Sequence, residues 1–213
     1  MEKSPWIIVA GLDGAGKTSL RDRIVDYLPG DVFSFKFPYQ DFVHPMLEIS
    51  GNGYPMDDTH TDELIFALDA RLTNYELKRW REKYDYVVSQ RGWPDHFIFG
   101  AIRGLSYKEE EKLLKTDELE KPSAIILLTT NPTTAYKRIE HDPDADKYEL
   151  PEILEIQYEE TKRFSRALSK NYQSLKIFEE VPNILIDTTD YTKKDTFEIA
   201  KAFLAEELDL GFE

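Results

Sequence analysis

Eight consecutive residues near the N-terminus have the types and spacing of a phosphate-binding loop. Residues 11–18 read Gly-Leu-Asp-Gly-Ala-Gly-Lys-Thr and match G-x-x-x-x-G-K-[ST] at every fixed position. In such a loop the glycines let successive backbone N–H groups face a phosphate, and the following helix adds partial positive charge. The motif therefore predicts binding of a nucleoside triphosphate by one continuous set of residues, namely Gly11, Asp13, Gly14, Ala15, Gly16, Lys17 and Thr18.

Two side chains of this loop have the chemistry that phosphoryl transfer requires. The Lys17 ammonium is expected to reach the β- and γ-phosphates as a catalytic cation, and the Thr18 hydroxyl to join the shell of a Mg²⁺ ion. ATP and Mg²⁺ are therefore the predicted cofactors. The sequence has no N-K-x-D guanine-reading motif and is short for a motor ATPase, which favours a small-molecule kinase. A glycine-rich turn that only packs a strand against a helix is the alternative.

The segments around the motif predict the elements that position it. Short apolar runs without a period of two are typical of strands buried on both faces of a parallel sheet, and five occur, at 6–10, 32–37, 86–89, 124–129 and 183–186. Longer amphipathic segments between them predict helices at 18–28, 60–83, 106–115, 151–175 and 192–208. This alternation predicts an α/β fold with a five-stranded parallel sheet and helices on both faces. We expect a single domain over 1–213, with a short polar lid at about 140–149.

The composition narrows the classes of function. The 213 residues include 27 basic and 41 acidic ones, which give a formal net charge of −14, and no cysteine. The lack of cysteine excludes disulfides, thiolate metal sites and a cysteine nucleophile. The negative charge disfavours extended nucleic-acid binding. No run reaches the roughly 18 apolar residues of a membrane helix, and the first residues show no signal peptide, so we expect a cytoplasmic protein without membrane contact.

Together with the phosphate-binding loop, several segments resemble the thymidylate kinase family of nucleoside monophosphate kinases. Residues 64–71 (Leu-Ile-Phe-Ala-Leu-Asp-Ala-Arg) are similar to its third-helix signature, and residues 87–91 (Val-Val-Ser-Gln-Arg) to its strand ending in Asp-Arg. Residues 37–38 (Phe-Pro) resemble the start of its acceptor-phosphate loop, and 135–139 with 146–149 its lid helix. The similarity covers nearly the whole chain, in the order of the family. It implies a P-loop kinase-type fold and a homodimer.

The resemblance also implies roles for individual residues of the acceptor site. Asp13 would contact the sugar of the acceptor, and Phe37 would lie in its phosphate loop. Phe66 would stack on the base and Arg71 would reach the base edge. Arg91 would hold the acceptor phosphate and take part in catalysis, next to Gln90 at the strand end. Two lid residues complete this set, Arg138 and Lys147.

Five positions around this pocket depart from the family pattern. Gln90 stands where the family has an aspartate, and a neutral amide is no general base and a weaker Mg²⁺ ligand than a carboxylate. The loop after Phe37 lacks its usual arginine, Ala10 replaces a glutamate, Phe99 falls near a polar reader of the base, and Lys147 replaces an arginine. Asp95 and His96 are possible replacement acid or base groups. By contrast, residues 109–111 (Glu-Glu-Glu) predict a solvated helix face.

The resulting functional prediction is ATP- and Mg²⁺-dependent phosphoryl transfer to a small-molecule acceptor. By resemblance this acceptor is a pyrimidine deoxynucleoside monophosphate, with thymidine monophosphate first. One alternative is a kinase of the same fold that phosphorylates a hydroxyl of a nucleoside or of a modified base in DNA. The missing phosphate-loop arginine favours this alternative, whereas the net charge of −14 speaks against the DNA version. A second alternative is a nucleotide-binding protein without catalytic activity.

Overall fold

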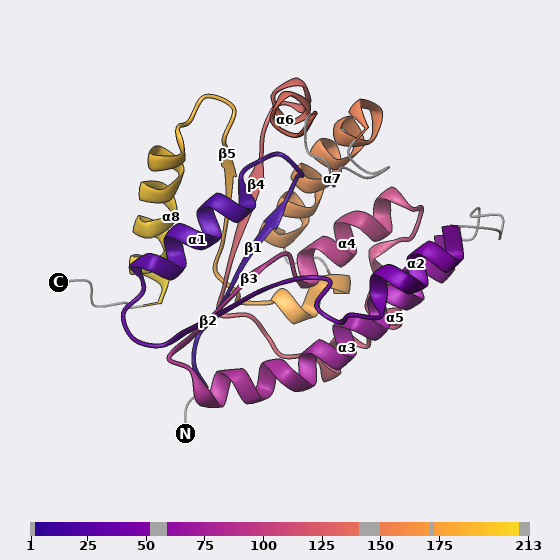
Figure 1. Cartoon of the computed structure of the whole chain (residues 1–213), viewed down its shortest axis with the longest axis horizontal. Coiled ribbons are helices and arrows are strands. Elements are labelled where there is room, and N and C mark those ends of the chain that lie inside the picture. Colours follow the sequence, from indigo (N-terminus) through magenta and orange to yellow (C-terminus); the bar gives the residue numbers. More distant parts are fainter. Residues whose placement is uncertain (1–2, 52–58, 141–149, 171–172, 209–213) are drawn as a thin grey trace.

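The computed structural model describes residues 3–51, 59–140, 150–170 and 173–208 (Figure 1). Its centre is a five-stranded sheet with the strand order β2-β3-β1-β4-β5. All four pairings between neighbouring strands are parallel. The strands are β1 (Trp6–Gly11), β2 (Val32–Lys36), β3 (Tyr86–Gln90), β4 (Ala124–Thr129) and β5 (Asn183–Asp187). The prediction of a five-stranded parallel sheet is confirmed.

The central strand β1 and its neighbour β4 are apolar on both faces because helices cover both sides of the sheet. All residues of β1 and β4 are buried. Alternate side chains of β1 enter two different clusters: Trp6 and Ile8 pack with one, and Ile7 and Val9 with the other. A strand that is buried in this way has no polar face, which explains why its sequence lacks an alternating pattern.

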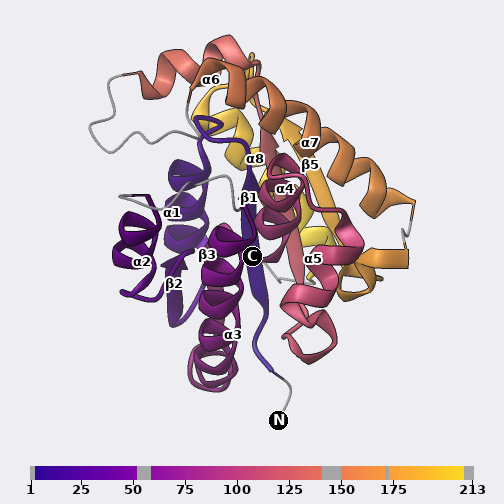
Figure 2. The same cartoon turned by 90° about the vertical axis from the view of Figure 1, so that its right-hand side faces the viewer.

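The helices form one layer on each face of the sheet (Figures 1 and 2). On one face lie α1 (Lys17–Tyr27) and α8 (Lys193–Glu207). On the other face lie α3 (Thr59–Lys83), α4 (Trp93–Ile102), α5 (Tyr107–Leu114) and α7 (Pro151–Ser169). Two shorter helices are α2 (Val43–Gly51) and α6 (Pro132–Ile139). Short 3₁₀ helices follow α5, at Thr116–Glu118, and precede β5, at Gln173–Phe178.

Most predicted helix boundaries agree with these ranges. A capping box precedes α5, since the Ser106 hydroxyl accepts from the Glu109 N–H at 3.3 Å and the Glu109 carboxylate accepts from the Ser106 N–H at 2.8 Å. Thr192 and Asp195 make the same arrangement before α8. One boundary is wrong: the helix predicted for 151–175 ends at Ser169. The chain leaves the helix there, and Leu175 is buried against the core from a 3₁₀ helix.

Helix α4 was not among the helices expected from the sequence. Most of its residues are buried, so it lacks the polar face on which a helical period depends. The predicted lid at 140–149 lies almost entirely outside the described residues, and so does Lys147.

Candidate active site

The phosphate-binding loop connects β1 to α1, as the sequence predicts. Gly11, Gly14 and Gly16 have φ angles of 113°, 76° and 96°, a region that favours glycine. A Cβ atom on Gly11 would lie 2.2 Å from the Leu128 carbonyl oxygen. Gly16 caps α1 without a side-chain hydrogen bond, so the first N–H groups of the helix have no capping side chain. This arrangement suits a phosphate at the helix N-terminus.

The Lys17 ammonium and the Asp13 carboxylate form the polar centre of the loop. Lys17 Nζ donates to the Gly11 carbonyl at 2.8 Å, to the Leu12 carbonyl at 3.0 Å and to Asp13 Oδ1 at 2.7 Å. The Arg91 guanidinium donates to the same Asp13 oxygen at 2.8 Å. Burial alone would raise the pKa of Asp13, but Lys17 and Arg91 outweigh it and hold this pKa well below its usual range. Asp13 is therefore a carboxylate shared by two cations.

Gln90 ends strand β3 beside the first turn of α1. Its Oε1 accepts from the Thr18 hydroxyl at 3.0 Å and from Arg21 Nη1 at 3.2 Å. Two neutral oxygens, one hydroxyl and one amide, thus lie together at the place where the resemblance implies an aspartate. They are hard oxygen ligands, of the kind that Mg²⁺ accepts when phosphates and water supply most of its shell.

Asp95 brings a second carboxylate to the phosphate-binding loop. It lies in the first turn of α4, where Oδ1 accepts from the Gly11 N–H at 3.3 Å and Oδ2 from the Gly92 N–H at 2.9 Å. Burial raises its pKa to about 6, against the opposing charges of Lys17 and Arg91. A carboxyl group with such a pKa is matched to proton transfer near neutral pH.

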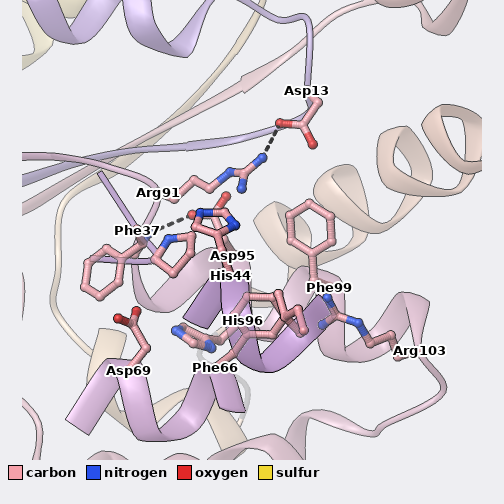
Figure 3. Close-up of a pocket in the computed structure, with 13 residues that line it drawn as sticks. Asp13, Phe37, His44, Phe66, Asp69, Arg91, Asp95, His96, Phe99 and Arg103 are labelled. Atoms are coloured by element: carbon pink, nitrogen blue, oxygen red, sulfur yellow. Dashed lines mark hydrogen bonds and ion pairs between the residues drawn. The ribbon is translucent and has the colours of Figure 1, made fainter. Parts of the chain in front are cut away.

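A cavity of about 140 Å³ begins at Asp13, Arg91 and Asp95 and extends away from the loop (Figure 3). Its apolar lining is Phe37, Pro38, Leu47, Phe66 and Phe99. Its other polar lining residues are His44, Asp69, His96 and Arg103. An aromatic cavity of this kind, joined to a phosphate-binding loop, suits a small planar ligand with one end directed at the loop.

Arg71, predicted to reach the base edge, lies outside this cavity. Five residues separate it from Phe66, which places it about 140° around the helix axis at 100° per residue. Its guanidinium instead donates to Glu118 Oε2 at 2.5 Å and to the Leu114 carbonyl at 3.4 Å. Asp69 follows Phe66 by three residues and lines the cavity, where its carboxylate accepts from the Tyr39 and Gln40 N–H groups at 3.0 and 2.7 Å.

His96 and Arg103, on the cavity wall, form a buried group with Glu110 and Glu63. Arg103 forms a short ion pair with Glu63, and its guanidinium carbon lies 5.0 Å from the centre of the Phe66 ring. Glu110 was predicted to lie on a solvated helix face, but only 1% of it is exposed. Gly100 makes this possible, because a Cβ atom there would lie 2.7 Å from Glu110 Oε2. Burial and the nearby Glu63 raise the pKa of Glu110 to about 9.

Comparison with known proteins agrees with this architecture, although no protein-family model matches the chain. The probable thymidylate kinases of Pyrobaculum aerophilum and Pyrobaculum calidifontis are each 28% identical to it over 152 residues. These matches cover 70% of the chain and 77% and 76% of the two relatives. The thymidylate kinase structure from Candida albicans matches with a TM-score of 0.65 at 14% identity, over 97% of this chain and 93% of that one. The chain is thymidylate kinase-like. Its fold is that of the P-loop kinases.

In this thymidylate kinase-like chain, the residues proposed for the site from the sequence do not all line one cavity. The structure brings together Asp13, Phe37, Phe66 and Arg91 around one cavity. Gln90 lies next to Thr18 instead. Arg138 lies on the other side of the loop and donates to the Gly14 carbonyl at 3.2 Å.

No described helix is long and apolar enough to cross a membrane.

Arg103 lines the cavity, although the sequence pattern did not predict a place for it in the site. Its position just after α4 could be recognised only once that helix was known. The sequence offers Asp95 and His96 as possible acid or base groups, and the structure places both on the cavity wall.

Proposed function

We propose that this chain is a nucleotide kinase that transfers the γ-phosphoryl group of ATP, bound as its magnesium complex, to a pyrimidine deoxynucleoside monophosphate. Thymidine monophosphate is the first candidate, because the curated relatives are named probable thymidylate kinases. The observation that carries the proposal is the ion pair between Asp13 and Arg91. Asp13 belongs to the phosphate-binding loop and Arg91 to the strand end, and both line the aromatic cavity. Donor and acceptor would therefore meet at this pair.

In this proposal each residue of the loop has a defined task. The loop N–H groups and Lys17 stabilise the negative charge on the transferring phosphoryl group. The Thr18 hydroxyl and Gln90 are the side chains that fit a magnesium ion held mainly by the phosphates. Arg91 neutralises the acceptor, and Phe37 and Phe66 contact its base. Phosphoryl transfer needs little covalent participation by the protein, so the absence of an aspartate at position 90 is compatible with activity.

A second candidate, phosphorylation of a hydroxyl group, is favoured by Asp95. A monophosphate acceptor is already ionised, whereas an attacking hydroxyl must lose its proton. In this reaction the hydroxyl oxygen would bond to the γ-phosphorus, the bond to the β-phosphate oxygen would break, ADP would leave, and Asp95 would accept the proton. The loop end of the cavity also carries two carboxylates, Asp13 and Asp95, beside Arg91, which favours a neutral acceptor group over a dianion.

An acceptor screen separates these functions. The purified protein is incubated with ATP, Mg²⁺ and a panel of deoxynucleosides and their monophosphates, and the products are identified by mass. We expect a product 80 mass units heavier than the acceptor, the mass of one transferred phosphoryl unit, and none with Lys17→Ala. Loss of a cation that stabilises the transition state lowers kcat by about 100-fold or more.

The variant Asp95→Asn then distinguishes the two acceptors. With a hydroxyl acceptor, loss of a general base lowers kcat by about 10²–10⁴-fold with little change in the KM for ATP. With a monophosphate acceptor the effect on kcat is expected to be only a few-fold, and the exposed Asp117→Asn is the matched control. If ATP binds and no acceptor is phosphorylated, the chain is a nucleotide-binding protein without kinase activity and the proposal is wrong.

A further inference from the structure

Among the described residues, Arg103 brings a cation to the wall of the aromatic cavity away from the phosphate-binding loop. The guanidinium carbon of Arg103 lies 5.0 Å from the Phe66 ring centre and 5.7 Å from that of Phe99 (Figure 3). Arg103 follows α4 and lines the cavity, and only 7% of its side chain is exposed. The guanidinium carbon of Arg91 lies 5.6 Å from the centre of the same Phe99 ring. The two arginines therefore mark the two ends of one pocket, with Arg91 at the loop.

The residue expected to recognise the base edge cannot do so from its observed place. Arg71 points to Glu118 and the Leu114 carbonyl, away from the cavity. Arg103 is therefore the described arginine that combines contact with Phe66 and a place on the cavity wall away from the loop.

We propose that Arg103 is the specificity-determining residue of the acceptor pocket and donates hydrogen bonds to an oxo group on the edge of the acceptor's base. This inference rests on the proposed nucleotide kinase function. A guanidinium only donates hydrogen bonds, so it matches a carbonyl oxygen and disfavours an amino group at the same position. The pyrimidine bases differ in this respect at position 4 of the ring, where thymine and uracil carry an oxo group and cytosine carries an amino group. By donating to this position, Arg103 selects thymine and uracil over cytosine.

The residues behind Arg103 hold it in this position. Glu63 is fully buried and pairs with its guanidinium, and the rings of Phe66 and Phe99 limit its movement from the cavity side. Burial, assisted by the Arg103 charge, lowers the pKa of His96 to about 3, so His96 is neutral at physiological pH. Glu110 is uncharged as well, because its pKa is raised. The charge of Arg103 is therefore balanced by Glu63, as in a preorganised ion pair.

The charge balance of this group disfavours a metal ion there. Ligand atoms of Glu63, His96 and Glu110 lie within 4.8 Å of one another. However, Arg103 already supplies the positive charge next to Glu63, and one proton on Glu110 neutralises the remaining carboxyl. A divalent cation would leave an excess positive charge in a buried site beside a guanidinium, which is unfavourable.

The test compares Arg103→Met with Arg71→Met. Methionine keeps an apolar chain of similar length against Phe66 while removing every donor. We measure kcat/KM for thymidine, deoxyuridine and deoxycytidine monophosphates, and for the corresponding nucleosides. The wild type is expected to prefer the 4-oxo bases. Arg103→Met is expected to lose about 10- to 100-fold in kcat/KM for these bases, the loss typical of a hydrogen bond to a charged group. Activity on the cytosine acceptor and the KM for ATP should change less than about 3-fold, and Arg71→Met should retain the wild-type preference.

Two further measurements keep the result interpretable. Arg103→Met leaves Glu63 without its ion-pair partner, so the double variant Arg103→Met/Glu63→Gln is made as well, and the fold of each variant is checked by circular dichroism. Calorimetric titration with the three monophosphates measures base preference without turnover. If the wild type phosphorylates none of the acceptors, the kinase proposal fails, and the titrations still decide the role of Arg103. An unchanged base preference in both Arg103 variants, or its loss in Arg71→Met, would overturn the inference.

Discussion

Replacing Glu110 with glutamine should stabilise the protein increasingly as the pH rises. Burial and the nearby Glu63 raise the pKa of this carboxyl from its ordinary value of 4.5 to about 9 in the folded chain. Between these two pH values the folded state retains a proton that the unfolded state has released, so the stability of the wild type falls as the pH rises. Each pH unit in this range costs about 1.4 kcal/mol. The cost is therefore about 1 kcal/mol at pH 5 and about 3 kcal/mol at pH 7. Glutamine has the same shape and no proton to lose, so the cost disappears.

The measurement is urea unfolding of the wild type and Glu110→Gln at several pH values from 5 to 8. The free energy of unfolding of the variant minus that of the wild type should increase by roughly 2–3 kcal/mol between pH 5 and pH 7. Taking the difference cancels the other titrating groups. Glu111→Gln, one residue further along α5, is the control and should show no such trend. A constant difference for Glu110→Gln across this range would show that Glu110 is ionised in the folded protein, and the charge balance described for Arg103 would be wrong.

Three further predictions follow from the loop and the caps. Gly11→Ala should lower the free energy of unfolding by about 3 kcal/mol or more in urea unfolding, since its Cβ would lie 2.2 Å from the Leu128 carbonyl oxygen at a φ of 113°; a small effect would mean that the loop can shift. Ser106→Ala should lower the free energy of unfolding by about 1 kcal/mol through loss of the α5 cap. An unchanged midpoint of urea unfolding would show that the cap does not contribute to stability. Gln90→Asp should strengthen the dependence of turnover on Mg²⁺ concentration, because a carboxylate next to Thr18 is a better magnesium ligand than an amide; identical magnesium titrations would separate Gln90 from the metal.

The sequence predicted those parts of the structure that depend on local pattern. The glycines and Lys17 identify the phosphate-binding loop because each fixed position of the motif is required either by the backbone conformation or by the charge of the phosphate. The five strands are recognisable as apolar runs, because burial on both faces leaves no other composition. Helix α4 has no such signature, since it is apolar on almost every side, and the residues that it brings to the cavity were therefore harder to place.

Errors within the candidate site arise from side-chain direction rather than from position along the chain. Arg71 lies on the expected helix, but one helical residue turns a side chain by about 100°, so similarity in composition did not ensure the same direction. Glu110 lies in an acidic run whose charge indicates solvent exposure. Its burial depends on Gly100, which leaves room for the carboxylate in a neighbouring helix. Contacts of this kind between helices are set by tertiary packing and have no signal in a local segment.

In the proposed kinase reaction, the shared carboxylate of Asp13 would make binding of ATP and binding of the acceptor thermodynamically dependent on each other. Its Oδ1 is held by Lys17 at 2.7 Å and by Arg91 at 2.8 Å. If a bound phosphate attracted the Lys17 ammonium, Asp13 would keep only its ion pair with Arg91. The negative charge of Asp13 would then act more strongly on Arg91, and the attraction between Arg91 and an anionic acceptor would weaken. If an acceptor bound to Arg91, Asp13 would likewise keep only its ion pair with Lys17, and the attraction between Lys17 and a phosphate would weaken. By linkage the change in affinity must be equal in both directions. In the proposed kinase, the side chain that orders the loop would thus also couple the occupancy of one ligand site to that of the other.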